Sequence, residues 1–280
     1  KWILAGPVTN SARVEAIQGD PNNPGTMYVA FGSGNLWKTI NNGLDWKPIF
    51  ENQPTLGIGD IAIAPSNSEI LYLGTGESLR KNRNFTMPGT GVYRSDDGGE
   101  TWVHLGLEDT WHIGEIAVHP LNPNIVFVAA MGKFWSESTS KGIYRTINGG
   151  KDWERVLYVN DDTRANDVVI AHSNPNMIYA SMWENNDDKN IAESVYGPNS
   201  GIYYSSDGGS SWKRSKNGLP NKPKIGRIGL AVSYQNAQKV YALIDNRNET
   251  GGNSAEVYQS INGGVTWKRS HNDTLRIFPG

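Results

Sequence analysis

One eight-residue pattern, Ser/Thr-x-Asp/Asn-x-Gly-x-x-Trp, occurs five times in this sequence and limits the fold more than any other feature. Its copies are residues 39–46, 95–102, 146–153, 205–212 and 260–267, and successive tryptophans lie 51 to 59 residues apart. Half of the 10 tryptophans in the 280-residue chain occupy this one position. A period of this length indicates a protein built from similar supersecondary units in series.

Each residue type in the pattern has a structural reason. The Asp or Asn accepts hydrogen bonds from the backbone of its own turn, the glycine suits a positive φ, and the tryptophan buries a large surface. Asparagine stands at three of the five acidic positions and cannot exchange a proton, so we interpret the motifs as structural rather than catalytic. The residues concerned are Asn41, Asp97, Asn148, Asp207 and Asn262 with Trp46, Trp102, Trp153, Trp212 and Trp267.

The sequence between the motifs predicts three short strands per unit, and the tryptophan is expected to begin a fourth. The first strands are expected at 61–64, 116–118, 168–171 and 228–232. Four strands per unit in series predict an all-β fold, a β-propeller of four-stranded blades in which 1–280 is a single domain.

The blades are expected at about 13–50, 57–106, 112–159, 164–216 and 224–271. Residues 1–4 resemble a fourth strand that would close a further blade. Because the last unit already has its own fourth strand at 267–270, we predict that the chain is a segment of a larger propeller.

The five motifs resemble the Asp boxes, or bacterial neuraminidase repeats, of sialidases, xyloglucanases and sortilin-type receptors. The segments at 57–78 (GIGDIAIAPSNSEILYLGTGES), 112–132 (HIGEIAVHPLNPNIVFVAAMG), 149–163 (GGKDWERVLYVNDDT) and 226–233 (GRIGLAVS) resemble sortilin-like or glycosyl-hydrolase-like repeat proteins secreted by bacteria. This resemblance covers essentially the whole chain and implies an exported propeller, outside the cell or at its surface. It supplies no catalytic residues, because the Arg-Ile-Pro segment, arginine trio and Tyr–Glu pair of sialidases have no counterparts here.

The amino-acid composition excludes several classes of binding partner and of fold. The 26 basic and 28 acidic side chains leave a net charge of −2, which argues against nucleic acid or a membrane surface as a partner. No apolar run reaches membrane-spanning length, and the absence of cysteine excludes a disulfide-stapled scaffold. The acidic stretch 185–188 lacks the spacing of a calcium loop, so we expect no metal and no cofactor.

Propeller geometry predicts where a ligand would bind. The first strand of each blade lines the central channel, and the loops that enter it share one face with the loops that leave the second strand. Candidates at the first strands are Asp60, Glu115, Asp167 and Arg227, and candidates at the ends of the second strands are Glu77, Glu184 and Asp245. Candidates in the loops are Trp111 and His112, accompanied by Arg13, Arg80, Arg83, Trp135, Arg164, Tyr196 and Lys224. A charge at the first residue of a strand is, however, commonly a solvated or ion-paired strand end, and this structural interpretation stays open for each position.

Three functions remain open at this point. The first is a recognition or scaffold module that binds a glycan or a polypeptide, or other cell-surface proteins, at this face. The second is a glycoside hydrolase, for which Asp60 with Glu115 or Asp167 are the candidate catalytic carboxyls; inverting hydrolysis needs two carboxyls about 6.5–9.5 Å apart. The third is an assembly factor. We favour recognition.

Overall fold

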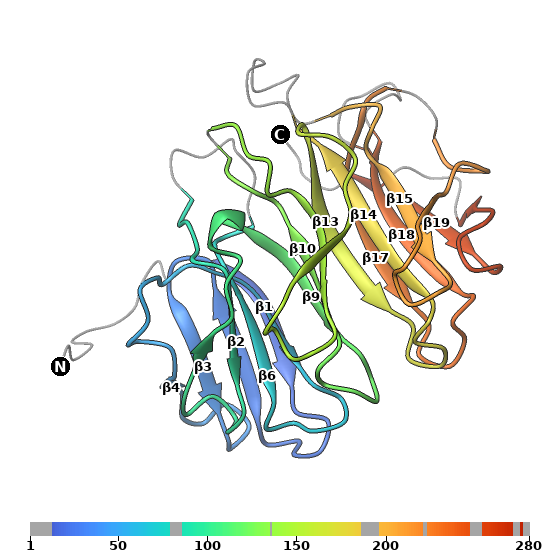
Figure 1. The fold of residues 1–280 in the computed structure, drawn as a ribbon. Helices are drawn as coiled ribbons and strands as arrows, with labels where there is room; N and C mark the ends of the chain where they lie inside the picture. Colours follow the sequence, from blue (N-terminus) through green and yellow to red (C-terminus); the bar gives the residue numbers. More distant parts are fainter. Residues whose placement is uncertain are drawn as a thin grey trace.

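The computed structural model describes residues 13–78, 86–134, 136–185, 196–220, 223–246, 254–270 and 275–276. They form five antiparallel sheets arranged side by side in an arc, the first four with four strands each and the last with a short fifth strand (Figure 1). The fold is therefore all-β and corresponds to a partial propeller. The expected strand at 1–4 lies outside the described residues.

Chain order equals sheet order within every unit, with the first strand at the inner side of the arc and the fourth at the outer side. The first two sheets contain β1 (Val14–Gly19), β2 (Met27–Phe31), β3 (Asn35–Thr39), β4 (Lys47–Pro48), β5 (Ile58–Ile63), β6 (Leu71–Thr75), β7 (Val92–Ser95) and β8 (Val103–His104). A 3-10 turn (Glu108–Thr110) leads to the third sheet, with β9 (Ile113–Val118), β10 (Val126–Ala130), β11 (Gly142–Thr146) and β12 (Glu154–Leu157).

The fourth and fifth sheets contain β13 (Thr163–Ile170), β14 (Ile178–Glu184), β15 (Gly201–Ser205), β16 (Lys213–Arg214), β17 (Ile225–Val232), β18 (Val240–Asn246), β19 (Ser254–Ser260) and β20 (Lys268–Arg269). The short β21 (Leu275–Arg276) also pairs with β19. Each fourth strand begins one residue after the motif tryptophan rather than at it, because the tryptophan closes the preceding turn.

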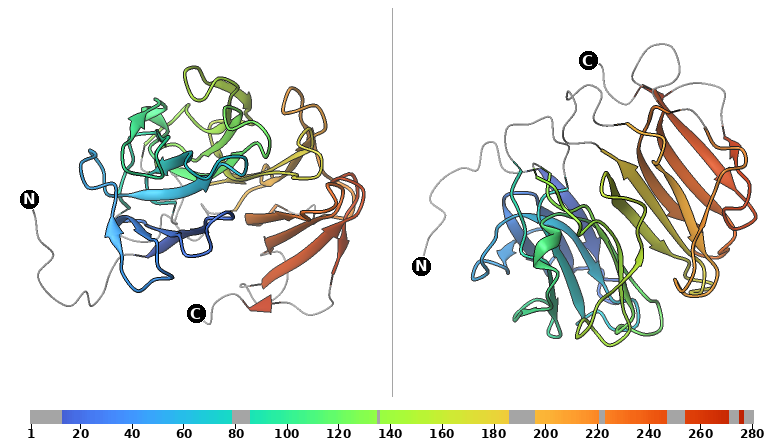
Figure 2. Two further views of the ribbon diagram at one scale, coloured as in Figure 1. Left: turned by 90° about the horizontal axis from the view of Figure 1, so that it is seen from below. Right: turned by 45° about the horizontal axis from the view of Figure 1, so that its top comes forward.

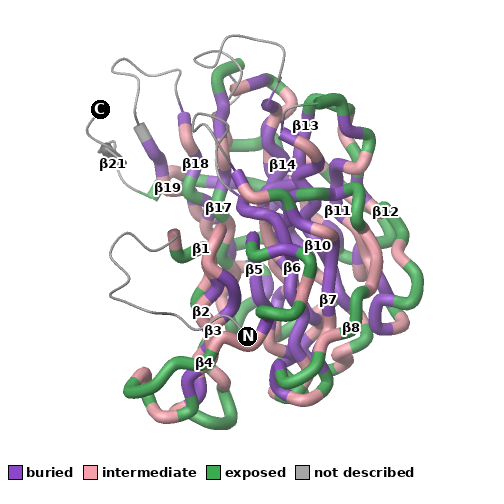
Figure 3. Tube along the Cα trace, turned by 90° about the vertical axis from the view of Figure 1, so that its left-hand side faces the viewer, coloured by how far each residue is buried: buried purple, intermediate pink, exposed green. Residues whose placement is uncertain are grey.

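The second strands reveal which sheets are covered on both faces. β6 and β10 are buried at every residue, and β14 at all but its last, whereas β2 and β18 alternate between buried and more exposed residues. Burial in the middle sheets is visible in Figure 3. The first and last sheets therefore each leave one face unpacked, and Figure 2 shows them on the two sides of the opening in the arc.

The first strands start three to five residues earlier than the sequence predicts in the second to fifth sheets. In each of these strands the pairing register shifts near the start, at a β-bulge. At Gly59 and Gly114 a side chain would collide with the main chain of the next sheet's first strand. The glycine and the bulge thus permit adjacent first strands to approach closely.

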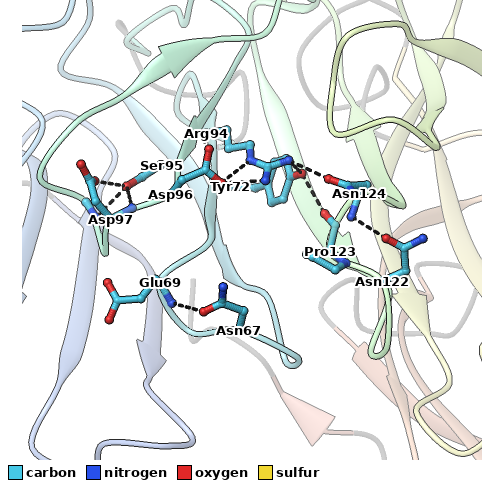
Figure 4. A network of polar contacts seen from close by, with 11 residues as sticks. Asn67, Glu69, Tyr72, Arg94, Ser95, Asp96, Asp97, Asn122, Pro123 and Asn124 are labelled. Carbon is cyan, nitrogen blue, oxygen red and sulfur yellow. Dashed lines mark hydrogen bonds and ion pairs between the residues drawn. The ribbon is translucent and has the colours of Figure 1, made fainter.

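The turn motifs, called Asp boxes below, form the same hydrogen bonds in all five sheets. In the second sheet (Figure 4), Ser95 Oγ donates to Asp97 Oδ1 at 2.7 Å and accepts the Gly99 amide at 2.8 Å. Asp97 Oδ1 also accepts the Thr101 amide at 2.8 Å, and Gly99 has φ +93°. Asparagine makes the equivalent acceptor bond to Asp45, Asp152 and Thr266 in its three boxes. These contacts agree with the structural interpretation of the motif.

Tyrosines at one position of the second strands join neighbouring sheets. The hydroxyls of Tyr28, Tyr72 and Tyr179 donate to the carbonyls of Gly98, Pro123 and Ala237, each in the following sheet, at 3.2, 2.8 and 2.7 Å. Arg94 strengthens one of these junctions by donating to Tyr72 and Asn124 (Figure 4). The end of the sheets that holds the boxes is therefore occupied by contacts between sheets.

Candidate functional site

Three carboxyl groups face the inside of the arc from adjacent first strands. Asp60, Glu115 and Asp167 stand on β5, β9 and β13, each within three to five residues of the strand start. Asp60 is 4% exposed, whereas Glu115 and Asp167 keep part of their surface exposed. The predicted candidates at this repeat position thus come together, although within the strands rather than at their entrances.

Two of these carboxyls hold the neighbouring sheet. Asp60 Oδ2 accepts the Ile116 amide at 2.8 Å, and Asp167 Oδ2 accepts the Leu230 amide at 2.8 Å. Each bond crosses from one first strand to the next. Asp60 and Asp167 therefore have a structural role in sheet packing, whatever else they do.

Burial makes the three carboxyls weaker acids. It raises the pKa of Asp60 to about 7, against the bonds from the Ile116 and Ile61 amides, and raises the pKa of Asp167 to about 6. Burial, and then the charges of Asp60 and Asp167, raise the pKa of Glu115 well above its usual value. A cluster of this kind shares protons near neutral pH, because like charges in a poorly hydrated site repel.

Arg227 supplies a positive charge to this group. It occupies the corresponding position on β17, and its Nε donates to Asn166 Oδ1 at 2.6 Å. The Arg227 guanidinium lowers the pKa of Asp167 and lies over the ring of Trp183, 5.3 Å from the centroid. It also lowers the pKa of Glu15 on β1, which burial raises on balance. The side chains that face inward from the five sheets therefore include both signs of charge.

The loop face, defined here as the end where the first strands begin and the second strands end, holds a second polar group. Glu77 is fully buried; its carboxylate forms an ion pair with Arg13 and accepts the Met87 amide at 3.3 Å. The His112 ring hydrogen-bonds the Glu77 carbonyl at 2.9 Å. Burial and then the Arg164 charge lower the pKa of His112 to about 3, so this imidazole is neutral near pH 7.

Aromatic side chains pack behind His112. The ring of Phe134 lies 4.2 Å from the His112 ring, centroid to centroid, and the Arg164 guanidinium lies 4.7 Å from the Phe134 centroid. Arg164 is fully buried and donates to the carbonyls of Met131 and Lys133 at 2.8 and 2.7 Å. These contacts make the interior of the loop face rigid.

Trp111 differs from these buried residues. It is 36% exposed, and the Lys133 ammonium lies 4.9 Å from the centroid of its ring. Its backbone has φ +53°, which is rare for a residue with a large side chain. The Trp111 carbonyl accepts the Gly89 amide at 2.7 Å, a bond that holds this conformation. Exposed aromatic groups on strained backbone are typical of binding positions.

The remaining candidates that the structure describes surround these groups. Glu184 Oε2 accepts the Asn199 amide at 2.7 Å, and Asp245 lies against Gly226 at the end of β18. Tyr196 packs partly buried against a cluster that contains Trp183, and Lys224 is exposed. Arg80, Arg83 and Trp135 lie outside the described residues.

The described part of the chain contains no group of three or more His, Asp or Glu side chains arranged to hold a metal ion. Within the same residues, no helix is long and apolar enough to cross a bilayer.

Known proteins resemble this chain in sequence and in fold. The family model for sortilin (neurotensin receptor 3) matches residues 90–221. A structure of an ancestral GH74 enzyme superposes with a TM-score of 0.68 at 22% identity, covering 92% of this chain and 31% of that one. A GH74 enzyme from Niastella koreensis gives a TM-score of 0.66 at 20% identity, covering 91% and 38%. Residues 90–221 are therefore similar to sortilin, and the chain shares the propeller fold of the GH74 enzymes.

Two curated proteins that are similar to this chain are named as xyloglucanases. Xyloglucanase Xgh74A of Acetivibrio thermocellus is 25% identical over 91% of the chain. A probable oligoxyloglucan-reducing end-specific xyloglucanase of Neosartorya fischeri is 23% identical over 77% of it. The chain spans only 32% and 25% of the lengths of these relatives.

Sequence reasoning missed several residues on the inner surface of the propeller. Glu15 and Asn166 occupy the bulge position that holds Gly59 and Gly114 in other sheets, and Lys133 and Trp183 contact two of the predicted candidates. Glu15 and Asn166 could have been found from the sequence, because each is a polar residue at a repeat position that holds glycine in other sheets.

Proposed function

We propose that this propeller is a recognition module that binds a polysaccharide at its loop face, with Trp111 as the surface on which a sugar ring stacks. The exposed, strained Trp111 is the observation that carries the proposal. The flat indole offers apolar area to the C–H face of a sugar, and the Lys133 ammonium over the ring fixes its orientation. The xyloglucanase names of the curated relatives suggest xyloglucan as the first ligand to test.

We also propose that the module acts outside the cell, as the sequence resemblance to secreted repeat proteins implies. Neighbouring groups support binding rather than turnover at this face. Glu77 is fully buried in an ion pair, and His112 stays neutral in a packed aromatic environment. Both are positioned to support the loop that carries Trp111 rather than to exchange protons with a substrate.

The test compares two tryptophans of similar exposure at opposite ends of the sheets. Xyloglucan binding is measured by tryptophan fluorescence titration and affinity electrophoresis for wild type, Trp111→Ala and Trp46→Ala; Trp46 is 37% exposed in an Asp box. Loss of a stacking surface is expected to weaken binding about tenfold in Trp111→Ala alone. Absence of saturable binding in wild type, or equal losses in both variants, would contradict the proposal.

Hydrolysis is a second candidate, because a raised carboxyl pKa like that of Asp60 or Glu115 is what a general acid requires. Asp60, however, accepts a hydrogen bond from the Ile116 amide, and this bond favours a structural role for the Asp60 carboxyl. Release of reducing ends from xyloglucan by wild type, reduced about 10²–10⁴-fold in Glu115→Gln, would establish catalysis and replace the recognition proposal.

A further inference from the structure

A cavity of about 360 Å³ lies between the fourth and fifth sheets, apart from Trp111 and the inward carboxyls. Its volume falls within the range of small-molecule sites. Its inner lining is aliphatic, formed by Ile202, Ile225, Ile228 and Ile244, all of which are at most 5% exposed. Ser200 and Ser215 also line the cavity and are buried, whereas Arg214, Lys216, Leu219 and Pro220 are more exposed and lie toward its opening.

The repeat explains why this space is empty. Four residues after the box tryptophan, the first sheet has Phe50 and the third has Leu157, which are 1% and 8% exposed. Phe50 packs against Tyr93 of the next sheet at 5.0 Å between ring centroids, and Leu157 joins the core between the third and fourth sheets. The second sheet uses the partly buried Leu107, one residue later. In the fourth sheet this position is Lys216, which is exposed, and the apolar residue of this loop that packs at the junction is Leu219, three residues later and only partly buried.

The charged side chains among the described lining residues are both cationic. Arg214 Nη2 donates to the carbonyls of Pro198 and Ser200 at 2.7 and 2.9 Å, which fixes the guanidinium at the edge of the cavity. Lys216 adds a second cation, and the described residues of the lining include no Asp or Glu. An aliphatic interior with a cationic entrance is complementary to an aliphatic chain that ends in an anion.

We propose that this cavity binds a medium-chain aliphatic carboxylate, with the alkyl chain against the isoleucines and the carboxylate between Arg214 and Lys216. Each additional methylene buried should tighten binding about fourfold until the cavity is full. An ion-paired head group should add about tenfold or more over a neutral one.

Calorimetric titration with octanoate, octanol and octylammonium tests the head group, and hexanoate tests the chain. We expect saturable one-to-one binding of octanoate, about tenfold weaker binding of octanol, and still weaker binding of octylammonium. Hexanoate should bind about 15-fold more weakly than octanoate, as two methylenes imply. No saturable octanoate binding, or equal affinity for all three head groups, would overturn the proposal.

Three variants locate the site. Lys216→Glu should weaken octanoate binding at least about tenfold, whereas Lys213→Glu, which changes an exposed lysine on β16 that does not line the cavity, should leave it unchanged. Lys216→Leu restores the apolar residue found in the third sheet and should abolish binding while raising the thermal midpoint. Equal losses in Lys213→Glu and Lys216→Glu, or full octanoate affinity in Lys216→Leu, would place binding elsewhere and overturn the proposal.

Discussion

The inward carboxyls make stability depend on pH in a direction opposite to that of ordinary ion-paired acids. Their pKa values are higher in the folded protein than near 4, the value expected when unfolded. The folded state therefore binds more protons between about pH 4 and pH 7. Their contribution to stability is fully present below pH 4 and is lost as the pH rises toward 7.

Glu115→Gln should accordingly raise the free energy of unfolding at pH 8 and change it much less at pH 5, because glutamine stays uncharged in the buried site whereas the carboxyl must ionise there at the higher pH. Urea unfolding at both pH values measures this, with the exposed Glu51→Gln as control. A Glu115→Gln protein that is less stable than wild type at pH 8 would show that the ionised carboxylate is needed for folding.

Single residues also show where sequence reasoning stops. The Asp boxes follow from local chemistry, because the Ser95, Asp97 and Gly99 contacts lie within one turn. Burial of the box tryptophans cannot be predicted from this local chemistry, because it depends on contacts with the preceding sheet. Trp102 donates to the Ile49 carbonyl of the first sheet, whereas Trp46 has the same motif and remains 37% exposed.

The β-bulge is the element that positions the inward-facing groups. The sequence predicted strands that start after the charged residue, since a charge beside an apolar run resembles a strand end. In the structure, β5 instead begins before the charged residue and includes Gly59 and the bulge, so that Asp60 lies within the strand. Gly59 is needed there because the first strand of the next sheet lies close to it. Contacts between neighbouring sheets, whose residues are far apart in sequence, determine where these strands begin. The repeat pattern alone therefore could not predict the strand starts.

Two glycines in first strands provide a matched test of the bulge. Gly59→Ala would drive a methyl group into the Ile113 carbonyl, and should destabilise the protein by about 1–3 kcal/mol. Gly229→Ala on β17 meets nothing within 4 Å and should be neutral or slightly stabilising. Guanidinium unfolding midpoints compare the two. Equal effects would mean that the first strands do not approach as closely as described.

At the scale of the whole molecule, the repeated tyrosines distinguish an open arc from a closed ring. Tyr28, Tyr72 and Tyr179 each bond to the following sheet. Tyr241 has the corresponding position on β18, but its hydroxyl accepts Gln259 Nε2 within its own sheet at 2.6 Å. On the same strand Leu243 is 43% exposed. This face has the chemistry of a junction between sheets, and we propose that it accepts a further sheet of the same kind.

Replacing each hydroxyl in this chain tests the open arc. Tyr179→Phe removes the donor to the buried Ala237 carbonyl and should lower the free energy of unfolding by about 1–2 kcal/mol. Tyr241→Phe removes the acceptor of the Gln259 side-chain amide, which is partly exposed and can bond to water instead. This change should alter the free energy of unfolding by less than about 0.5 kcal/mol. Urea unfolding at two protein concentrations measures both, because a face covered by another copy would make the loss at Tyr241 depend on concentration. A concentration-independent loss at Tyr241 equal to that at Tyr179 would mean that the first sheet closes onto the last and the arc is a ring.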